Sequence, residues 1–237
     1  MKEDMTFAKK VLKFNNKLSK AHLELPDGFR MINPFNDDNA EQIKKITTMF
    51  YDTYYNDKKP RRMIIGSSPA RRGTAVTGVP YEDATHLQNV TGIYIDSFYV
   101  NKSSSNFLYD VIEQYGGPEK FYSKFYMNFV CPLGIVRTNS KSNEVNCNYY
   151  ESKKLQKQLS SFILESLRSQ IEFGIDTSVC YCIGSGENYT FLSKINDKYQ
   201  FFKTIVPLEH PRFIMQYNSK RKEEFIEKYL EALKNYK

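Results

Sequence analysis

The stretch of residues 63–83, MIIGSSPARRGTAVTGVPYED, constrains the fold of this chain more than any other part of the sequence. It begins with an apolar run, residues 63–65, that is too short for a helix and rich enough in β-branched residues for a buried strand. Gly66 ends this run, and small, turn-forming and basic residues follow it. A strand followed by such a loop is typical of the carboxyl edge of a sheet. This is the edge at which open α/β sheets bind their ligands.

The residue types in this loop suit a ligand site, but they also suit an ordinary connection. Gly66 and Ser67 allow the backbone to approach a ligand closely, and Tyr81 offers a flat face for a base or a sugar. The same residues fit a strand-to-helix connection in which Arg71 and Arg72 are solvated. On residue types alone, both interpretations stand.

The spacing of the loop residues favours the ligand site. The segments GSSPA at residues 66–70 and TGVPY at residues 77–81 resemble the first active-site motif of the uracil-DNA glycosylase superfamily, especially its single-strand-selective (SMUG-like) bacterial branch. That motif reads Gly-x-Asn-Pro-Gly and then Thr-Gly-x-Pro-Phe. Ser68 stands where the family has its catalytic asparagine, and Ala70 replaces a glycine that lies against the flipped base. The residues that the resemblance places around the base are Gly66, Ser67, Ala70 and Tyr81.

A second resemblance concerns His210, at the end of the last predicted strand. A lone histidine in such a place is more often structural than catalytic. However, His210 and Pro211 resemble the family's second motif, His-Pro, and the segment RFIMQY at residues 212–217 is also similar to the bacterial relatives. The resemblance implies that His210 donates a hydrogen bond to the oxygen of a base that leaves as an anion.

A third resemblance concerns Asn128. In the family, an asparagine shortly before Cys-Pro-Leu reads the uracil edge, and Asn128 precedes CPL at residues 131–133. One more residue separates the asparagine from the cysteine here than in the family, and a slip of one residue turns a strand side chain to the opposite face. Asn128 is therefore either a base-binding residue or a structural asparagine near a strand end.

Cleavage of a base–sugar bond also requires a positioned water. The resemblance implies that residue 68 holds this water, and the Ser68 hydroxyl can accept a hydrogen bond from it although the side chain is shorter than asparagine. An acidic residue, Asp83 or Glu82, is the expected substitute where Ser68 does not reach. The candidate catalytic residues are thus Ser68, Asp83 and His210.

Charge and aromatic content favour DNA as the partner. The net charge is +7, the pI is about 9.0, and 18 Tyr and 17 Phe residues are present. A basic groove with aromatic side chains is a common way to hold single strands. Phe213, Met215 or one of their neighbours is expected to fill the space that a flipped base leaves, and lysine and arginine are expected to neutralise phosphates. The expected phosphate contacts are Arg71, Arg72, Arg212, Lys220 and Arg221, although the basic run at residues 220–222 also fits a solvated helix start.

Strand and helix patterns alternate along the chain and predict one α/β domain, residues 1–237, with an N-terminal helical extension over about residues 1–60. The expected architecture is a three-layer α/β/α fold around a central four-stranded, mostly parallel sheet, as the resemblance also implies. Residues 138–148 are expected to form a loop, and residues 93–100 fit either strand or loop. Strands are expected at residues 63–65, 121–133, 179–183 and 203–208, and helices at residues 6–25, 39–54, 86–92, 107–115, 155–171, 187–195 and 223–233.

The sequence offers little to suggest a metal, a cofactor or a membrane. The four cysteines and three histidines lack metal-ligand spacing, so the cysteines are expected to be reduced thiols. No apolar run has membrane-spanning length, and the N-terminus lacks the apolar core of a signal peptide. We expect a cytoplasmic protein without a cofactor and, by default, a monomer.

Three functions follow from these residues. The first is a monofunctional DNA glycosylase that removes uracil or another deaminated base, with altered activity because of Ser68 and Ala70. The second is a protein with a glycosylase fold that binds damaged or single-stranded DNA but is catalytically weak or inactive. The third is a hydrolase of free nucleosides, whose activity would depend little on salt.

Overall fold

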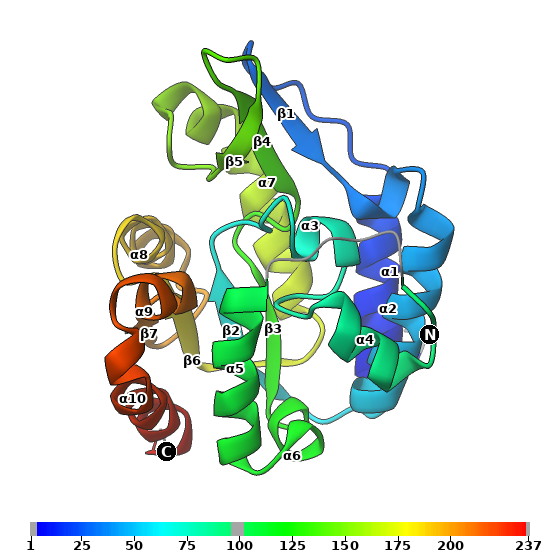
Figure 1. The fold of residues 1–237 in the computed structure, drawn as a ribbon, viewed down its shortest axis with the longest axis vertical. Helices are drawn as coiled ribbons and strands as arrows, with labels where there is room; N and C mark the ends of the chain where they lie inside the picture. Colours follow the sequence, from blue (N-terminus) through cyan, green and yellow to red (C-terminus); the bar gives the residue numbers. More distant parts are fainter. Residues whose placement is uncertain (1–3, 96–101, 236–237) are drawn as a thin grey trace.

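The computed structural model describes residues 4–95 and 102–235, with a four-stranded parallel sheet at the centre (Figure 1). The strand order is β3-β2-β6-β7, so the strand that precedes the Gly66 loop lies inside the sheet. Parallel strands that are covered on both faces are apolar throughout, which explains the runs in the sequence. The predicted parallel sheet is confirmed. Its strands are β2 (Arg61–Gly66), β3 (Phe125–Phe129), β6 (Ile175–Ile183) and β7 (Ile205–Leu208).

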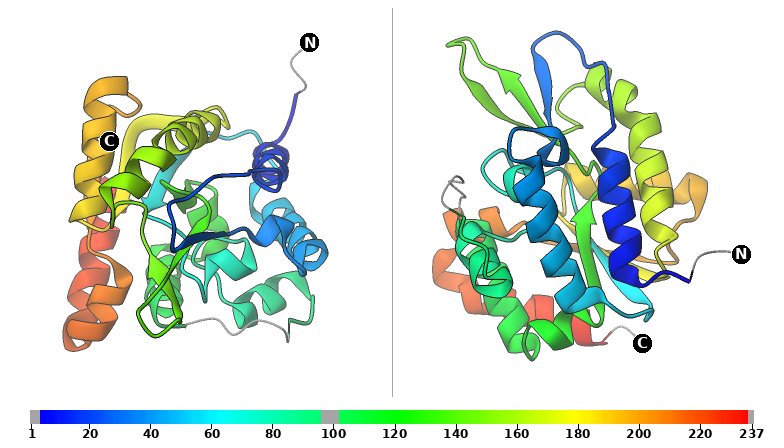
Figure 2. Two further views of the ribbon diagram at one scale, coloured as in Figure 1. Left: turned by 90° about the horizontal axis from the view of Figure 1, so that it is seen from above. Right: turned by 90° about the vertical axis from the view of Figure 1, so that its right-hand side faces the viewer.

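Helices cover both faces of this sheet, as the sequence predicts (Figures 1 and 2). On one face, Phe7 in α1 packs against Tyr126 in β3, with ring centroids 5.3 Å apart. On the other, Tyr115 in α5 packs against Phe125, with centroids 5.4 Å apart. The helices are α1 (Phe7–Leu18), α2 (Ala40–Tyr55), α3 (Thr74–Thr77), α4 (Ala84–Thr91), α5 (Lys102–Tyr115), α6 (Pro118–Tyr122), α7 (Lys153–Ile171), α8 (Glu187–Tyr199), α9 (Pro211–Tyr217) and α10 (Lys222–Asn235), with 3-10 turns η1 (Pro34–Asn36) and η2 (Ser219–Arg221).

A second, antiparallel sheet was not predicted from the sequence. It has the order β1-β4-β5, formed by β1 (Phe29–Ile32), β4 (Gly134–Thr138) and β5 (Glu144–Cys147). Figure 2 shows these strands together at one end of the molecule. The expected loop over residues 138–148 is therefore wrong for Thr138, which ends β4, and for residues 144–147, which form β5, whereas residues 139–143 connect the two strands. The strands are short and half-exposed, so their polar residues do not show the apolar run by which the parallel strands are recognised.

The second core strand is also shorter than predicted. Phe121 and Tyr122 belong to helix α6, and the strand itself begins at Phe125. Both segments are aromatic and buried, so hydrophobicity does not separate them. Of residues 93–100, whose conformation the sequence leaves open, 96–100 lie outside the described residues.

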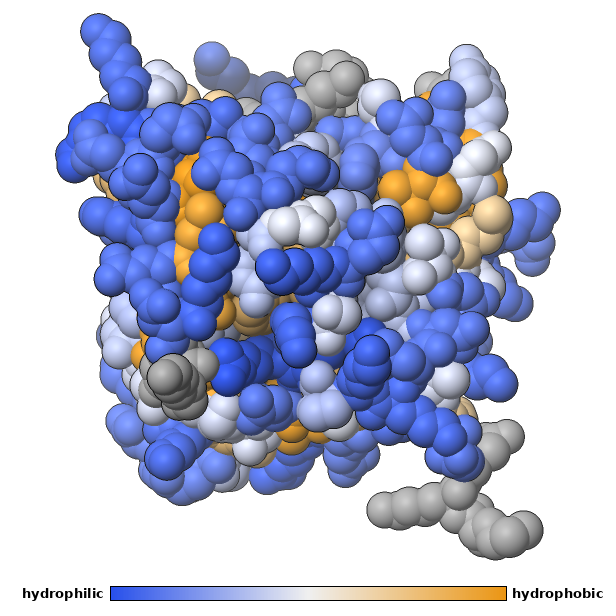
Figure 3. Space-filling model, turned by 90° about the horizontal axis from the view of Figure 1, so that it is seen from below, coloured by the Kyte–Doolittle hydropathy of each residue, from blue (hydrophilic) through white to orange (hydrophobic). Residues whose placement is uncertain are grey.

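The end of the molecule where α6 lies is largely hydrophilic. Figure 3 shows this end, where hydrophobic residues form only small, separate areas among the described residues. Within the described part of the chain, no helix is both long and apolar enough to cross a membrane. The same residues contain no cluster of three or more His, Cys, Asp or Glu side chains that could hold a metal ion, and all four cysteines are buried as free thiols.

Candidate functional site

A cleft of about 840 Å³ lies at the carboxyl end of the parallel sheet. The loop after β2, the end of β3, the strand β5 and the start of α9 form its walls, so segments far apart in the sequence meet there. This is the position at which α/β sheets bind ligands. The predicted site residues that line the cleft are Ser67, Ser68, Ala70, Arg71, Arg72, Tyr81, His210, Arg212 and Phe213.

Tyr81 and Phe129 form an aromatic wall of the cleft. Their rings stack with centroids 5.1 Å apart and an interplanar angle of 29°. Gly66 lies directly beneath them, because a Cβ atom at this position would clash with the Tyr81 hydroxyl and would lie 2.9 Å from Cδ1 of Phe129. Glycine at position 66 is therefore required by the close approach of the two rings. Tyr81 itself has φ of +61°, and its backbone N–H donates to the Thr74 hydroxyl at 3.0 Å.

Two hydroxyl groups of cleft residues have no hydrogen-bond partner among the described residues. They belong to Ser68 and Tyr81, and both oxygen atoms are inaccessible to solvent. Burial raises the pKa of Tyr81, so its phenol stays protonated. Buried polar groups are nearly always hydrogen-bonded, and an exception at a binding site points to a group that a ligand or water supplies.

Asn148, which lies directly after strand β5 of the second sheet, faces Ser67. The Ser67 hydroxyl donates to Oδ1 of Asn148 at 2.9 Å, and Tyr150 lies next to Ser67. All three residues line the cleft. Neither Asn148 nor Tyr150 is predicted as a site residue from the sequence, because Asn148 ends the expected loop and Tyr150 follows it directly. Their alternation with the buried Cys147 and Tyr149 was the signal that could have identified them.

His210 caps the start of helix α9 from the edge of the cleft. Its Nδ1 accepts a hydrogen bond from the backbone N–H of Arg212 at 3.0 Å. Burial, together with the charge of Arg212, lowers the pKa of His210 to about 4. The ring is therefore neutral at pH 7, with its proton on Nε2, and it can donate one hydrogen bond without carrying a charge.

Asp83 does not line the cleft. Its carboxylate caps helix α4 by accepting from the backbone N–H of His86 at 2.9 Å, and it also accepts from the Ser105 hydroxyl at 3.2 Å. An N-cap aspartate stabilises a helix by satisfying a free backbone N–H. The structure thus gives Asp83 a structural task, and its expected role toward water stays a prediction.

Glu82, the neighbour of Asp83, does line the cleft, although its side chain is almost fully buried. Its two oxygens accept hydrogen bonds from Tyr122 at 2.6 Å and from Tyr109 at 2.9 Å, and Nδ1 of His86 also contacts it. Burial alone would lower the pKa of His86, but the hydrogen bond and charge of Glu82 raise it. A buried carboxylate is here stabilised by a complete set of partners.

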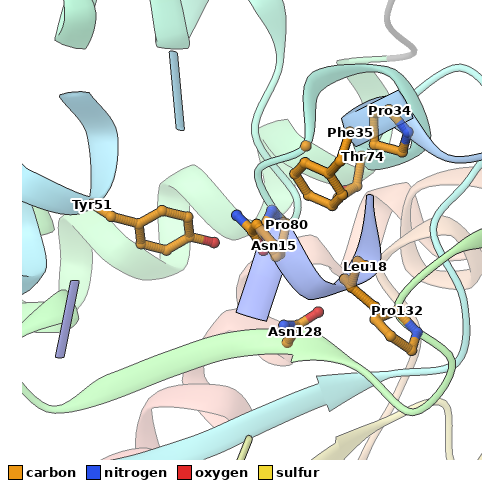
Figure 4. A pocket seen from close by; sticks show the side chains of 10 residues that line it. Asn15, Leu18, Pro34, Phe35, Tyr51, Thr74, Pro80, Asn128 and Pro132 are labelled. Atoms are coloured by element: carbon orange, nitrogen blue, oxygen red, sulfur yellow. The ribbon is translucent and has the colours of Figure 1, made fainter. Parts of the chain in front are cut away.

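Asn128 lies on the opposite side of strand β3 from the cleft. Phe125 and Phe129 face helix α5 and the cleft, so the alternation along the strand turns Asn128 toward α1. There its amide donates to the Tyr126 hydroxyl at 2.5 Å and lines a small cavity of about 10 Å³ (Figure 4). The structure therefore favours the structural interpretation of Asn128, and Phe129 occupies the position that faces the cleft.

Of the predicted DNA-binding residues, some lie at the cleft and others beside it. Arg212 and Phe213 project from the start of α9, where Phe213 and Tyr217 are exposed and their rings lie 5.9 Å apart. Lys220 and Arg221 are exposed in η2 and do not line the cleft. Arg221 forms an ion pair with Glu224 at 2.8 Å, so its charge is partly neutralised.

The fold and the cleft together define a class: an α/β protein with an aromatic wall and a neutral histidine at the carboxyl end of a parallel sheet. The family model "Uracil DNA glycosylase superfamily" matches residues 53–234. The chain therefore belongs to the uracil-DNA glycosylase superfamily. Membership supports a function of the DNA glycosylase type, acting on DNA, which belongs to DNA repair.

A solved structure gives a more specific likeness. "The crystal structure of WT Pedobacter heparinus SMUG2" superimposes on this chain with a TM-score of 0.91 and 44% sequence identity, covering 97% of each chain. The predicted SMUG-like membership and the glycosylase fold are thereby confirmed. The comparison with curated proteins finds no match.

Proposed function

We propose that this protein hydrolyses the N-glycosidic bond of uracil or another deaminated base in DNA. The bond is buried in a duplex, so the nucleotide must be extruded into the cleft or presented as a single strand. There the base would stack beside Tyr81 and Phe129, in contact with the loop after Gly66. The likeness to SMUG2 and the aromatic wall support this arrangement.

The single observation that carries the proposal is the hydrogen bonding and protonation of the His210 ring. Its Nδ1 is occupied by the backbone N–H of Arg212, and its pKa is lowered to about 4, so a neutral Nε2–H group is available at pH 7. A departing base develops negative charge on its oxygen, and a fixed donor aimed at that oxygen lowers the barrier. Ser68, whose hydroxyl has no partner among the described residues, would hold the attacking water.

Excision from labelled oligonucleotides tests this function. Substrates carry uracil, hypoxanthine or xanthine in single- and double-stranded form, and alkali cleaves the strand wherever a base has been lost. We expect cleavage by the wild-type protein and a loss of about 100-fold or more in His210→Ala, as for removal of an electrostatic donor. Cleavage of no substrate, with salt-dependent DNA binding intact, would overturn the proposal.

A second candidate function is that of a catalytically weak or inactive glycosylase that binds DNA. The observation that favours it is that both carboxylates that line the described part of the cleft, Glu82 and Glu144, are already bound to other side chains, Glu144 to Arg30 at 2.7 Å. Asp83 caps a helix and Glu82 is held by three partners, so neither is available as the substitute for the family's asparagine, and the shorter Ser68 stands in that asparagine's place. Uracil excision that appears only in a Ser68→Asn variant would support this second function.

A further inference from the structure

We propose that Asn148 reads the base in the cleft and selects bases that carry a carbonyl oxygen in place of an exocyclic amino group. This inference rests on the proposed function and names the residue that gives it specificity. Strand β3 presents Phe129 to the cleft and turns the Asn128 amide away, so β3 supplies no polar group there. A donor must then come from another element.

The Asn148 amide is held in one orientation. Its Oδ1 accepts a hydrogen bond from the Ser67 hydroxyl at 2.9 Å, so the single proton of this serine is directed at the amide oxygen. With Oδ1 occupied in this way, the Nδ2 group of Asn148 is the part of the amide left to donate, and Asn148 lines the cleft. No hydrogen bond from this Nδ2 is found among the described residues.

The backbone of Asn148 is equally well fixed. Its N–H donates to Oε1 of Glu151 at 2.9 Å, and the residues on both sides, Cys147 and Tyr149, are buried. The Tyr149 hydroxyl donates to Oδ1 of Asn188 in α8 at 2.7 Å. A recognition group held in this way loses little conformational entropy when a ligand binds, so its hydrogen bond can contribute fully to selectivity.

An amide N–H donor distinguishes deaminated bases from normal ones by simple complementarity. Cytosine and adenine present amino N–H donors at the positions where uracil and hypoxanthine present carbonyl oxygens. Nδ2 of Asn148 would bond a carbonyl oxygen, whereas it would oppose an amino group donor to donor. A buried donor without a partner costs free energy, so the selectivity includes rejection of the normal base as well as attraction of the deaminated one.

The test compares Asn148→Asp, Asn148→Ala and the control Asn143→Ala, which changes an exposed asparagine of the same hairpin outside the cleft. Aspartate keeps the acceptor for Ser67 but removes the donor. We expect both Asn148 variants to excise uracil about 10- to 100-fold more slowly than wild type, as for loss of a hydrogen bond within a buried site. Asn148→Asp should also lose preference for uracil over cytosine. Thermal unfolding verifies that the variants remain folded.

Binding measurements separate failure of this inference from failure of the proposed function. Fluorescence anisotropy gives the Kd for matched single-stranded oligonucleotides with one uracil or one cytosine. If wild type excises nothing, the glycosylase function fails, but tighter binding of the uracil strand that Asn148→Asp abolishes still supports the role of Asn148. An unchanged uracil-to-cytosine ratio in folded Asn148→Asp, in excision or in binding, would overturn it.

Discussion

The backbone N–H of Arg212 donates a hydrogen bond to Nδ1 of His210, with 3.0 Å between the two nitrogens. This bond arises because His210 is the N-cap of α9 and Pro211 is the first residue of that helix, so the first free N–H in the helix is that of Arg212. The first turn of α9 therefore fixes which ring nitrogen of His210 carries the proton. The same helix start would oppose protonation of the ring, in agreement with the lowered pKa of His210.

The first prediction concerns the order in which the histidines titrate. As the pH falls from 8, His86 should gain its proton first, because Glu82 raises its pKa, and His210 should follow only near pH 4. An ordinary histidine has a pKa of about 6.5. NMR titration of the imidazole carbons measures both values, with His86→Gln and His210→Ala to assign the signals. A His210 signal that titrates near pH 6.5 would contradict the neutral-donor mechanism.

The second prediction concerns stability and pH at His86. Because the folded pKa of His86 is raised, the contact with Glu82 stabilises the fold fully below about pH 6.5, and the contribution is lost as the pH rises through the folded pKa. We expect His86→Gln to lower the free energy of unfolding by about 1 kcal/mol at pH 5.5 and by less at pH 9, since the side chain is partly exposed. Urea unfolding at both pH values gives the difference.

Comparing wild type with His86→Gln also removes the contribution of His210 to the pH dependence of stability. Its lowered pKa makes the wild-type fold less stable as the pH falls toward 4, but it does so equally in wild type and in His86→Gln. The difference between the two proteins therefore isolates His86. A difference that grows with rising pH would show that His86 is not stabilised by its charge.

The third prediction separates a functional hydroxyl from a structural one. The Tyr81 hydroxyl is buried without a partner among the described residues, so Tyr81→Phe should leave the free energy of unfolding unchanged or raise it by up to about 1 kcal/mol. The Tyr122 hydroxyl donates to buried Glu82 at 2.6 Å, so Tyr122→Phe should lower it by about 1–3 kcal/mol. Urea unfolding of both variants checks this pair.

Excision assays complete the third prediction. If the Tyr81 hydroxyl serves a bound base or water, Tyr81→Phe should excise uracil more slowly although it is at least as stable as wild type. Tyr122 itself does not line the cleft and its hydroxyl is bonded to Glu82, so Tyr122→Phe should lose stability first. Full excision activity in Tyr81→Phe would indicate that its hydroxyl makes no contact in the reaction.

The sequence predicts the central sheet well because its strands are buried on both faces. Residues 63–65 and 179–183 are short, continuous apolar runs, and the helices between strands have regular apolar spacing. The second sheet has neither property. In β4, three buried residues are followed by exposed Arg137 and Thr138, and in β5 only Cys147 is buried. The pairing of β4 with β1 joins residues more than 100 positions apart. Only tertiary structure establishes such strands.

The sequence predicts those site residues whose backbone position follows from a motif. The GSSPA loop and His210 reach the cleft because each follows directly on a parallel strand. Asn128 and Asp83 were expected in the site because they lie close to motifs in the sequence. The direction in which a strand residue or a helix cap points its side chain depends on register, however, and closeness in sequence does not give the register. Asn148 was not predicted because β5, the strand that ends directly before it at Cys147, is not recognisable from the sequence.

The fourth prediction concerns the arginines that contact DNA. Arg212 is exposed, lines the cleft and takes part in none of the ion pairs found among the described residues, whereas Arg221 is already paired with Glu224. Each phosphate contact adds about one to the salt dependence of binding. We therefore expect Arg212→Ala to reduce the slope of log Kd against log salt by about 1, and Arg221→Ala to reduce it by less. Fluorescence anisotropy from 50 to 200 mM salt measures both slopes. Equal reductions would place the DNA backbone along η2 as well as α9, and no change in Arg212→Ala would remove Arg212 from the DNA contacts.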